Sequence, residues 1–574
     1  MKFQLLEGNQ GAKLWIDNEY EKDGIYFADV HMKLAEKDVP KKFVARAALP
    51  CVDCYSTWGP DIKESRILSP EWEMRRTYSS LAQLMPVQSI ISVKNRNRYT
   101  IAINDAFSPI GIKTGIVEET AAIRLDIVFF TYATAEIEEY SATIRVDMRD
   151  IPYYDSIYDV VNWWEKDCGY PPSHVPEHAK LPMNSLWYSF HQRLDVDEII
   201  KQCRLSKEIG MDTVIVDDGW QTDDNGRGYA YCGDWEVCEK KIPNMKEFVD
   251  RVHETGMKFM LWYSVPFVGV HSKAFERFKT MLLCDNPDRV DFASLDPRYK
   301  EARDYLIGIY TKAVKDWGLD GLKLDFIDWF KLASSNFAPD DRRDFVSLEE
   351  AIDRLMTDIT DALREINPDI LIEFRQAYVG PAIRKYGNML RVSDCPNDSL
   401  RNRLGSIDLR FTSGNTAVHS DMLMWHVDDP VESAAMQFIN VIFSVPQISV
   451  LIDKLPEDHY KMLKFYLAFW RANADTLLDG KLWANDPQSG YSSAGSRLGD
   501  KAITVLFTDS VADCTGIADA TVINGTRLDA VYVKGCNGKN ATVLNCMGEE
   551  IASFVIDGNI AEINLPLAGM VLIK

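Results

Sequence analysis

Short apolar segments alternate with amphipathic segments between residues 183 and 479, and this alternation constrains the fold more than any other feature. The apolar segments read SLWYSF, TVIVDD, FMLWYSV, LKLDF, ILIEF, MLRVS, TAVHS and ISVLI. Strands that alternate with helices are typical of βα units around a parallel sheet. Eight such units predict a closed (β/α)8 TIM barrel, because an open doubly wound sheet needs a glycine-rich first turn that the chain lacks.

The helices between these strands are predicted from apolar residues on one helical face. In 245–254, Met245, Phe248, Val249 and Val252 follow the spacing i, i+3, i+4, i+7, and a glycine closes the segment. Further helices are predicted over 299–317 and 348–366.

The barrel is expected to carry β-rich regions on both sides, which makes the protein a multidomain α/β chain. Residues 1–167 contain β-branched and aromatic runs separated by turn residues and predict an N-terminal β-sandwich. Residues 168–182 contain four prolines and are interpreted as a linker. Residues 480–574 predict a small antiparallel C-terminal β domain.

The net charge and the cysteines limit the classes of partner and cofactor that the chain is expected to have. The chain has 86 acidic and 64 basic side chains and a formal charge of −22, which argues against nucleic acid and membranes as partners. It shows neither a leader peptide nor about 18 consecutive apolar residues, so we expect a cytoplasmic protein. The odd number of cysteines, 11, indicates reduced thiols, and the pair Cys51 and Cys54 has no second metal-binding pair. No metal or other cofactor is predicted, and the oligomeric state stays open.

Polar side chains follow several of the predicted strands where each strand ends. They are Asp217, Asp218, Trp262, Lys323, Asp325, Glu373, Arg375, Arg391 and Asp394. In a TIM barrel the reactive groups come from the carboxyl ends of the strands, so these side chains are expected to meet at one rim. Carboxylates, cations and aromatic rings together suit a neutral, polyhydroxylated small molecule.

Two of these carboxylates can support glycoside hydrolysis with retention of configuration. That reaction needs an ionised nucleophile and a protonated acid about 5 to 5.5 Å apart. Lys323 lies two positions before Asp325 on the same face of its strand and is expected to keep Asp325 ionised. The acid is expected where fewer cations reach it. Taken singly, each carboxylate also fits a salt bridge or a helix cap, and the tryptophans fit ordinary packing.

Several motifs together resemble glycoside hydrolase family 36, the α-galactosidases, in their compact form. They are VIVDDGWQTDD, GDWEVCEKKIPNM, KFMLWYSVPF, SLDPRYKEARDYL, GLDGLKLDFID and RVSDCPND, in this order between residues 214 and 398. The resemblance implies a retaining, exo-acting enzyme that forms a covalent galactosyl intermediate without a metal and releases terminal α-galactose from oligosaccharides of the raffinose or melibiose type.

The resemblance also implies roles for individual residues. Asp325 becomes the nucleophile, and Lys323 a ligand of a sugar hydroxyl. Asp217 and Asp218 hold the O4 and O6 hydroxyls and so select galactose. The further substrate-binding residues are Trp187, Trp262 and Arg391.

The resemblance places the acid/base three or four residues after Arg391, at Asp394 or Cys395. Because a thiol is a poor acid at neutral pH, Asp394 is the choice, with Asp398 in reserve. The N-terminal region can send a tryptophan into such a pocket, and Trp58 is the candidate.

Three alternatives stay open at this stage. The same mechanism serves an α-N-acetylgalactosaminidase, another α-glycosidase or a galactosyltransferase. A metal-dependent barrel hydrolase needs paired histidines, whereas His191 and His419 are isolated and are interpreted as structural. A sugar-binding pseudoenzyme is disfavoured because both candidate carboxylates are present.

Overall fold

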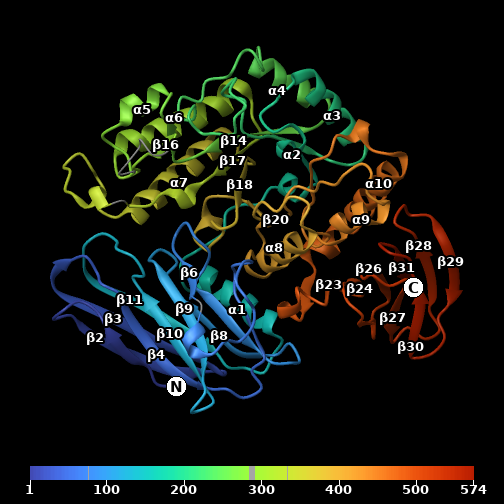
Figure 1. Cartoon of the computed structure of the whole chain (residues 1–574), viewed down its shortest axis with the longest axis horizontal. Coiled ribbons are helices and arrows are strands. Elements are labelled where there is room, and N and C mark those ends of the chain that lie inside the picture. The colour runs from blue at the N-terminus through green and yellow to red at the C-terminus, as the bar shows by residue number, and fades with distance from the viewer. Residues whose placement is uncertain (75, 284–290, 333) are drawn as a thin grey trace.

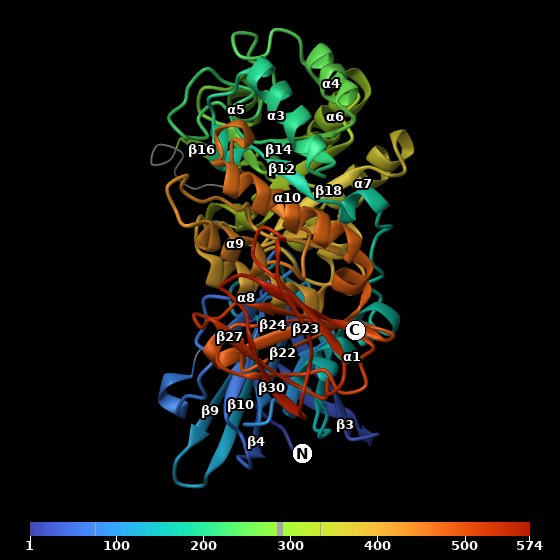
Figure 2. The same ribbon diagram turned by 90° about the vertical axis from the view of Figure 1, so that its right-hand side faces the viewer.

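The chain forms a barrel with β-rich regions below it, as a computed structural model covering residues 1–74, 76–283, 291–332 and 334–574 shows. In Figure 1 the N-terminal strands lie at the lower left, the barrel above, and the C-terminal strands at the right. The view turned by 90° again places the barrel above both β-rich regions (Figure 2).

The N-terminal region consists of two antiparallel sheets. Their strand orders are β1-β4-β10-β9-β6 and β2-β3-β11-β8-β7-β5. The strands are β1 (Gln4–Glu7), β2 (Lys13–Lys22), β3 (Ile25–Asp38), β4 (Phe43–Pro50), β5 (Ser56–Trp58), β6 (Arg76–Ser79), β7 (Val87–Ile91), β8 (Asn97–Ile103), β9 (Ile110–Val117), β10 (Ala122–Phe129) and β11 (Ile137–Asp147). Alternate residues of β3, among them Val30 and Met32, are buried against Leu125 and Ile127 in one core. Period-2 alternation therefore produces a sheet with one face turned inward.

One helix interrupts the expected run of strands. Helix α1 covers Tyr153–Lys166, where only sandwich strands were expected, and it buries Ile157, Val160, Val161 and Trp164. These residues fall at i, i+3, i+4 and i+7, which is helical spacing, so the β-branched composition alone was misleading. The helix turns its apolar face toward the barrel side of the sandwich.

Eight parallel strands form the barrel, as predicted. Their order is β20-β19-β18-β17-β14-β13-β12-β21, and bridges from His419 to Val445 and from Leu423 to Ile448 bring the two ends together. The strands are β12 (Met183–Ser185), β13 (Thr213–Val216), β14 (Lys258–Ser264), β17 (Gly321–Asp325), β18 (Leu371–Arg375), β19 (Met389–Arg391), β20 (Ala417–His419) and β21 (Gln447–Ile448).

The first predicted strand is wrong in its position. The segment SLWYSF was expected to be extended, but β12 ends at Ser185 and Trp187–Phe190 form the short helix α2. The chain then turns at His191, whose φ is 48°. A short apolar run fits a strand and a buried helix equally well, which explains the error.

Helices cover the barrel. The predicted helices 245–254 and 348–366 are confirmed as α4 (Met245–Glu254) and α7 (Leu348–Ile366), and α6 (Lys300–Trp317) begins one residue later than predicted. The others include α3 (Val196–Glu208), α8 (Ser399–Thr412), α9 (Val431–Ile439) and α10 (Glu457–Ala472).

The proline-rich segment 168–182 closes the amino end of the barrel. Ala179 and Val175 pack against a layer of strand residues that includes Met183, Ile215 and Met260. The ring of His419 is fully buried and lies 2.7 Å from the carbonyl oxygen of Ala179. Burial lowers the pKa of His419 to about 4, so the ring is neutral and serves packing, as a structural histidine does.

The C-terminal strands form a sheet of seven and a sheet of three. Their orders are β22-β23-β24-β26-β31-β28-β29 and β25-β27-β30. Most pairs are antiparallel, but β24 with β26 and β25 with β27 run parallel. The strands are β22 (Lys481–Asn485), β23 (Ser493–Leu498), β24 (Lys501–Leu506), β25 (Val511–Asp513), β26 (Asp519–Asn524), β27 (Ala530–Lys534), β28 (Asn540–Leu544), β29 (Glu550–Val555), β30 (Ile560–Asn564) and β31 (Met570–Ile573).

A buried polar network joins the three regions. Asp408 of α8 accepts hydrogen bonds from Trp58 at 2.9 Å, from Tyr491 and from the guanidinium of Arg66. The exposed fractions of Trp58, Arg66 and Asp408 are 0, 8 and 2 %. An ion pair at this depth contributes to stability only while both partners are present.

We expect Asp408→Ala to destabilise the protein by about 3–5 kcal/mol, because Arg66 keeps its charge in a buried place without a partner. Denaturant unfolding measures the change. The matched control is Asp316→Ala, which removes an exposed pair with Lys312 and should cost less than about 0.5 kcal/mol. Equal effects of the two substitutions would contradict the assigned role of the network.

Candidate active site

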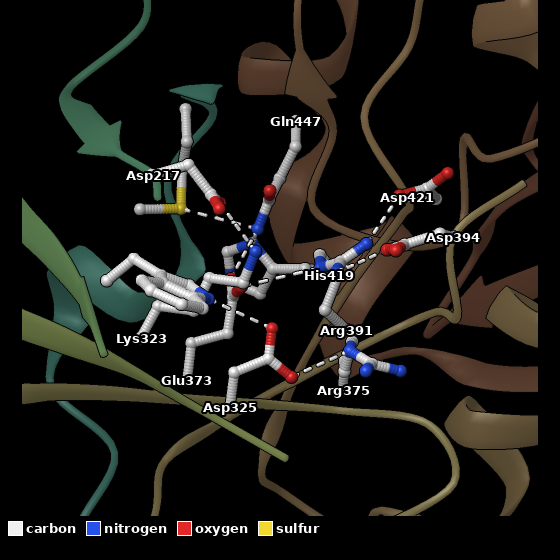
Figure 3. A network of polar contacts seen from close by, with 12 residues as sticks. Asp217, Lys323, Asp325, Glu373, Arg375, Arg391, Asp394, His419, Asp421 and Gln447 are labelled. Atoms are coloured by element: carbon white, nitrogen blue, oxygen red, sulfur yellow. Dashed lines mark hydrogen bonds and ion pairs between the residues drawn. The ribbon is translucent and has the colours of Figure 1, made fainter. Parts of the chain in front are cut away.

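Charged side chains from five strands or strand ends meet at the carboxyl rim of the barrel, as Figure 3 shows. They come from β13, β17, β18, β19 and β20, and the register of the parallel sheet places Lys323 beside Glu373 and Arg375 beside Arg391. The group consists of Asp217, Lys323, Asp325, Glu373, Arg375, Arg391, Asp394 and Asp421. The sequence prediction of one convergent rim therefore agrees with the geometry.

Asp325 is held by donors on both carboxylate oxygens. Oδ1 accepts hydrogen bonds from Arg375 Nε at 2.8 Å, from the Phe326 backbone N–H at 2.8 Å and from the Tyr378 hydroxyl. Oδ2 accepts one from Trp262 Nε1 at 3.0 Å. Phe326 has φ = 67°, a costly conformation for a bulky residue that accompanies the contact of its own N–H with the carboxylate. Oδ2 is the less saturated oxygen of the two.

These donors and nearby cations keep Asp325 ionised. Burial by itself raises the pKa of Asp325, but the charges of Arg375 and Lys323 and the hydrogen bond from Tyr378 outweigh burial and hold the pKa far below its usual range. The sequence argument assigned this effect to Lys323 alone. In the structure Lys323 acts only through its charge, because its ammonium group donates to Asp217 at 2.6 Å.

Asp217 and Asp218 follow β13 and differ in their surroundings. Asp217 pairs with Lys323 and accepts a hydrogen bond from the Asp218 N–H at 2.9 Å. Asp218 accepts hydrogen bonds from Gln192 at 2.5 Å and Gln221 at 2.7 Å, both of them neutral amides. Burial raises the pKa of Asp218 to about 6, and the charge of Asp217 adds to this.

Arg391 connects three carboxyl groups. Its guanidinium donates to Asp394 at 2.8 Å and to Asp421, and its Nε lies 3.5 Å from Glu373. Arg391, Glu373 and Asp421 are buried, whereas the side chain of Asp394 is 49 % exposed. Asp394 is therefore the member of this group that a ligand can reach.

The expectation that few cations reach the second carboxylate is wrong for Asp394. Burial raises the pKa of Asp394, but the charges of Arg391, Arg375 and Lys323 outweigh burial and lower it in the absence of a ligand, even though the charge of Asp325 opposes them. Asp421 carries the raised pKa instead, about 6, because it is fully buried and lies beside Asp394.

Aromatic rings form one wall of the rim. Tyr229 lies in the loop after β13, with its ring centroid 6.3 Å from that of Trp262 and 5.2 Å from that of Phe326. Burial raises the pKa of Tyr229, and the charges of Asp325 and Asp218 add to this. Trp187 is half-buried on α2, and the centroid of its ring lies 4.8 Å from that of His191.

Two predicted site residues lie elsewhere or have another role. Trp58 is buried in the network described above, where its indole N–H donates to Asp408 and Tyr491. The indole therefore joins the three regions and does not reach the rim. Asp398, the reserve for the acid/base, caps α8 by accepting a hydrogen bond from the Arg401 N–H at 3.0 Å.

Sequence reasoning missed several residues of this site. Tyr378 and Tyr229 lie in loops whose course no local pattern indicates. Gln192 follows a strand that was placed wrongly. Asp421 directly follows the predicted strand TAVHS, and the rule of polar residues at strand ends would have selected it.

Within the described ranges, no three or more histidine, cysteine or acidic side chains gather in a way that could hold a metal ion. No described helix is long and apolar enough to cross a membrane.

The fold and the rim define a TIM-barrel protein with a cluster of carboxylates and cations at the carboxyl ends of its strands. The family model described as Melibiase matches residues 178–404. Among the solved structures, a family 36 α-galactosidase, AgaA from Geobacillus stearothermophilus in complex with raffinose, has a TM-score of 0.65 at 14% identity, covering 97% of this chain and 80% of that one. The resemblance to family 36 is thus confirmed, and so is the predicted fold.

Curated relatives are similar over shorter stretches. Alpha-galactosidase Mel36A from Lactobacillus acidophilus is 31% identical over 154 residues, which cover 25% of this chain and 19% of that protein. An A type blood alpha-D-galactosamine galactosaminidase from Flavonifractor plautii is 25% identical over 174 residues, covering 27% of this chain and 15% of that protein. The chain thus spans about a fifth or less of these two relatives.

Proposed function

We propose that the protein is a retaining, exo-acting α-galactosidase that removes terminal α-linked galactose from oligosaccharides of the raffinose or melibiose type. The observation that carries this proposal is the pairing of an ionised, buried Asp325 with a reachable Asp394 at one rim. Relatives and structural neighbours that are named α-galactosidases support the activity.

In the proposed reaction Asp325 Oδ2 attacks C1 of galactose while Asp394 gives its proton to the departing oxygen. The ester between Asp325 and galactose then forms, and the leaving group departs as an alcohol. Asp394 next takes a proton from water, whose oxygen attacks C1 and frees Asp325. The low pKa of Asp325 fits both steps, since a stable carboxylate is ionised before attack and leaves readily afterwards.

Asp394 must carry a proton when the substrate is bound. In the free protein three cations favour its ionised form. A bound sugar excludes water from the half-exposed side chain and strengthens the repulsion from Asp325, and both effects raise the pKa of Asp394. Asp394 therefore becomes protonated when the substrate binds.

Asp217, Asp218 and Lys323 supply the polar contacts that select galactose. Two carboxylate acceptors and one ammonium donor at the end of β13 and on β17 can take adjacent sugar hydroxyls, while Trp262 and Tyr229 offer apolar faces. Arg391 and Trp187 complete the proposed binding set. The similarity to an alpha-D-galactosamine galactosaminidase makes galactosamine a second candidate sugar, and a panel of nitrophenyl α-glycosides distinguishes the two.

Replacing the nucleophile should abolish turnover. We expect Asp325→Gly to lower kcat by more than about 10⁴-fold, and azide should restore the reaction and yield β-galactosyl azide, because azide enters from the face that the carboxylate occupied. Product analysis by NMR tests this. Asp369→Gly, at an exposed acidic residue, serves as the control. Full activity of Asp325→Gly would rule out the assignment.

Replacing the acid should affect substrates according to their leaving group. We expect Asp394→Ala to slow raffinose hydrolysis by about 10²–10⁴-fold. Nitrophenyl α-galactoside should lose much less, because nitrophenolate leaves without a proton. Steady-state kinetics on both substrates test this. An equal loss on both substrates would contradict Asp394 as the acid and assign that role to another carboxyl group.

The pH dependence of kcat/KM should follow the protonation of Asp218 rather than that of Asp325. Because burial raises the pKa of Asp218 to about 6, protonation removes its charge as the pH falls through that value, whereas Asp325 stays ionised. We expect kcat/KM for nitrophenyl α-galactoside to fall by up to about tenfold per pH unit below pH 6. Asp218→Asn should lower kcat/KM and remove this acid limb, whereas Asp398→Asn should leave it in place. An acid limb that persists in Asp218→Asn would contradict the assignment and would point to Asp421, whose pKa is also about 6.

A further inference from the structure

One buried guanidinium group is shared by two carboxyl groups of the rim. Arg391, at the end of β19, donates from Nη2 to Asp394 at 2.8 Å and from Nη1 to Asp421, as Figure 3 shows. Because both nitrogens belong to one planar group, the two carboxyl groups lie close to each other. The charge of Arg391 is therefore divided between two carboxylates.

Asp421 is fixed on all sides and has no access to a ligand. Its Oδ2 accepts hydrogen bonds from the Cys395 backbone N–H at 2.6 Å and from the Tyr188 hydroxyl at 2.9 Å. The side chain of Asn402 binds the backbone N–H and the carbonyl oxygen of Asp421, at 2.9 and 3.1 Å. The side chain of Asp421 is 0 % exposed, whereas that of Asp394 is 49 % exposed. Any part that Asp421 plays in the reaction must therefore act through its neighbours.

The ionisable groups that face Asp421 come from α2, β19, the loop after β19, and β20. They are Tyr188, Arg391, Asp394, Cys395 and His419. Burial raises the pKa of the Tyr188 hydroxyl and of the Cys395 thiol and lowers that of His419 to about 4, so these three are uncharged at neutral pH. Of this group, only Arg391 and Asp394 are charged.

The charge of Asp421 sets how strongly Arg391 favours the anion of Asp394. When Asp421 is ionised, its charge offsets that of Arg391 and repels an anionic Asp394, and both effects favour a protonated Asp394. When Asp421 is protonated, the full charge of Arg391 acts on Asp394 and favours its anion. Because burial raises the pKa of Asp421 to about 6, the ionised state is the main one at pH 7.

We propose that Asp421 is a positioning residue for the acid: its buried carboxylate offsets the charge of Arg391, so that Asp394 holds a proton when the substrate is bound. This assignment rests on the proposed glycosidase function and adds the residue that regulates its acid. It accounts for an acid that lies 2.8 Å from a guanidinium, a place that by itself favours an anion.

Removal of the charge of Asp421 should weaken the acid selectively. The alkaline limb of kcat reports the pKa of the acid in the substrate complex. We expect Asp421→Asn to move this limb by about 1–2 pH units to lower pH for raffinose, and to lower kcat at pH 7 by up to about 10–100-fold. Nitrophenyl α-galactoside should lose much less, because its leaving group needs no proton. The control is Asp398→Asn, whose carboxylate caps α8, and it should leave the alkaline limb in place.

A second measurement needs no turnover. Coupling between two groups is reciprocal, so removal of the charge of Asp394 must lower the pKa of Asp421 by the same amount. We expect the infrared carboxyl band of Asp421 to titrate near pH 6 in the unaltered protein, and about 1 pH unit lower or more in Asp394→Asn. The band is assigned by its loss in Asp421→Asn, and an Asp218→Asn background removes the overlapping titration of Asp218.

The possible results are distinct. An alkaline limb that Asp421→Asn leaves in place, or a fall in kcat of the same size for raffinose and nitrophenyl α-galactoside, would overturn the role of Asp421. So would a titration near pH 6 that does not move in Asp394→Asn. If Asp421→Asn does not fold, the comparison of Asp218→Asn with Asp218→Asn/Asp394→Asn decides alone. Failure of the unaltered protein to hydrolyse either substrate would instead refute the proposed function, and the titration would still decide whether the two carboxyl groups are coupled.

Discussion

The site depends on one physical constraint, which is that a closed parallel barrel brings the carboxyl ends of all its strands to the same rim. Five carboxyl groups at this rim are held by only three cations, Lys323, Arg375 and Arg391. Charges at this depth are tolerated only when each is paired and hydrogen-bonded. The cations therefore hold the carboxylates in place and also balance their charge.

The unequal sharing of these cations separates the carboxyl groups chemically. Asp325 receives four donors and stays ionised, whereas Asp218 receives only neutral amides and its pKa rises to about 6. Asp394 lies between these extremes, because Arg391 favours its anion while the charge of Asp325 opposes it. Side chains of one type thus acquire different protonation behaviour from position alone, which is what a reaction with an anionic nucleophile and a neutral acid requires.

The sandwich takes part in the site indirectly. Its Trp58 anchors the barrel through a hydrogen bond to Asp408, and its loops line a cavity together with barrel residues that follow β17 and β18. The distance between the sandwich and the barrel is set by backbone contacts such as Leu84 with Ala377.

The sequence by itself determined the barrel, its helices α4 and α7, and most of the charged rim. Local periodicity encodes each βα unit. Because the strands are parallel, polar residues at their carboxyl ends meet at one rim of the barrel. It did not determine helix α1 or the first strand, since short apolar runs are ambiguous between helix and strand. Only the tertiary structure decided which cation holds which carboxylate, that Tyr378 and Tyr229 join the site, and that Trp58 does not. These pairings depend on distances between loops far apart in the chain, and pKa values follow from such distances rather than from residue types.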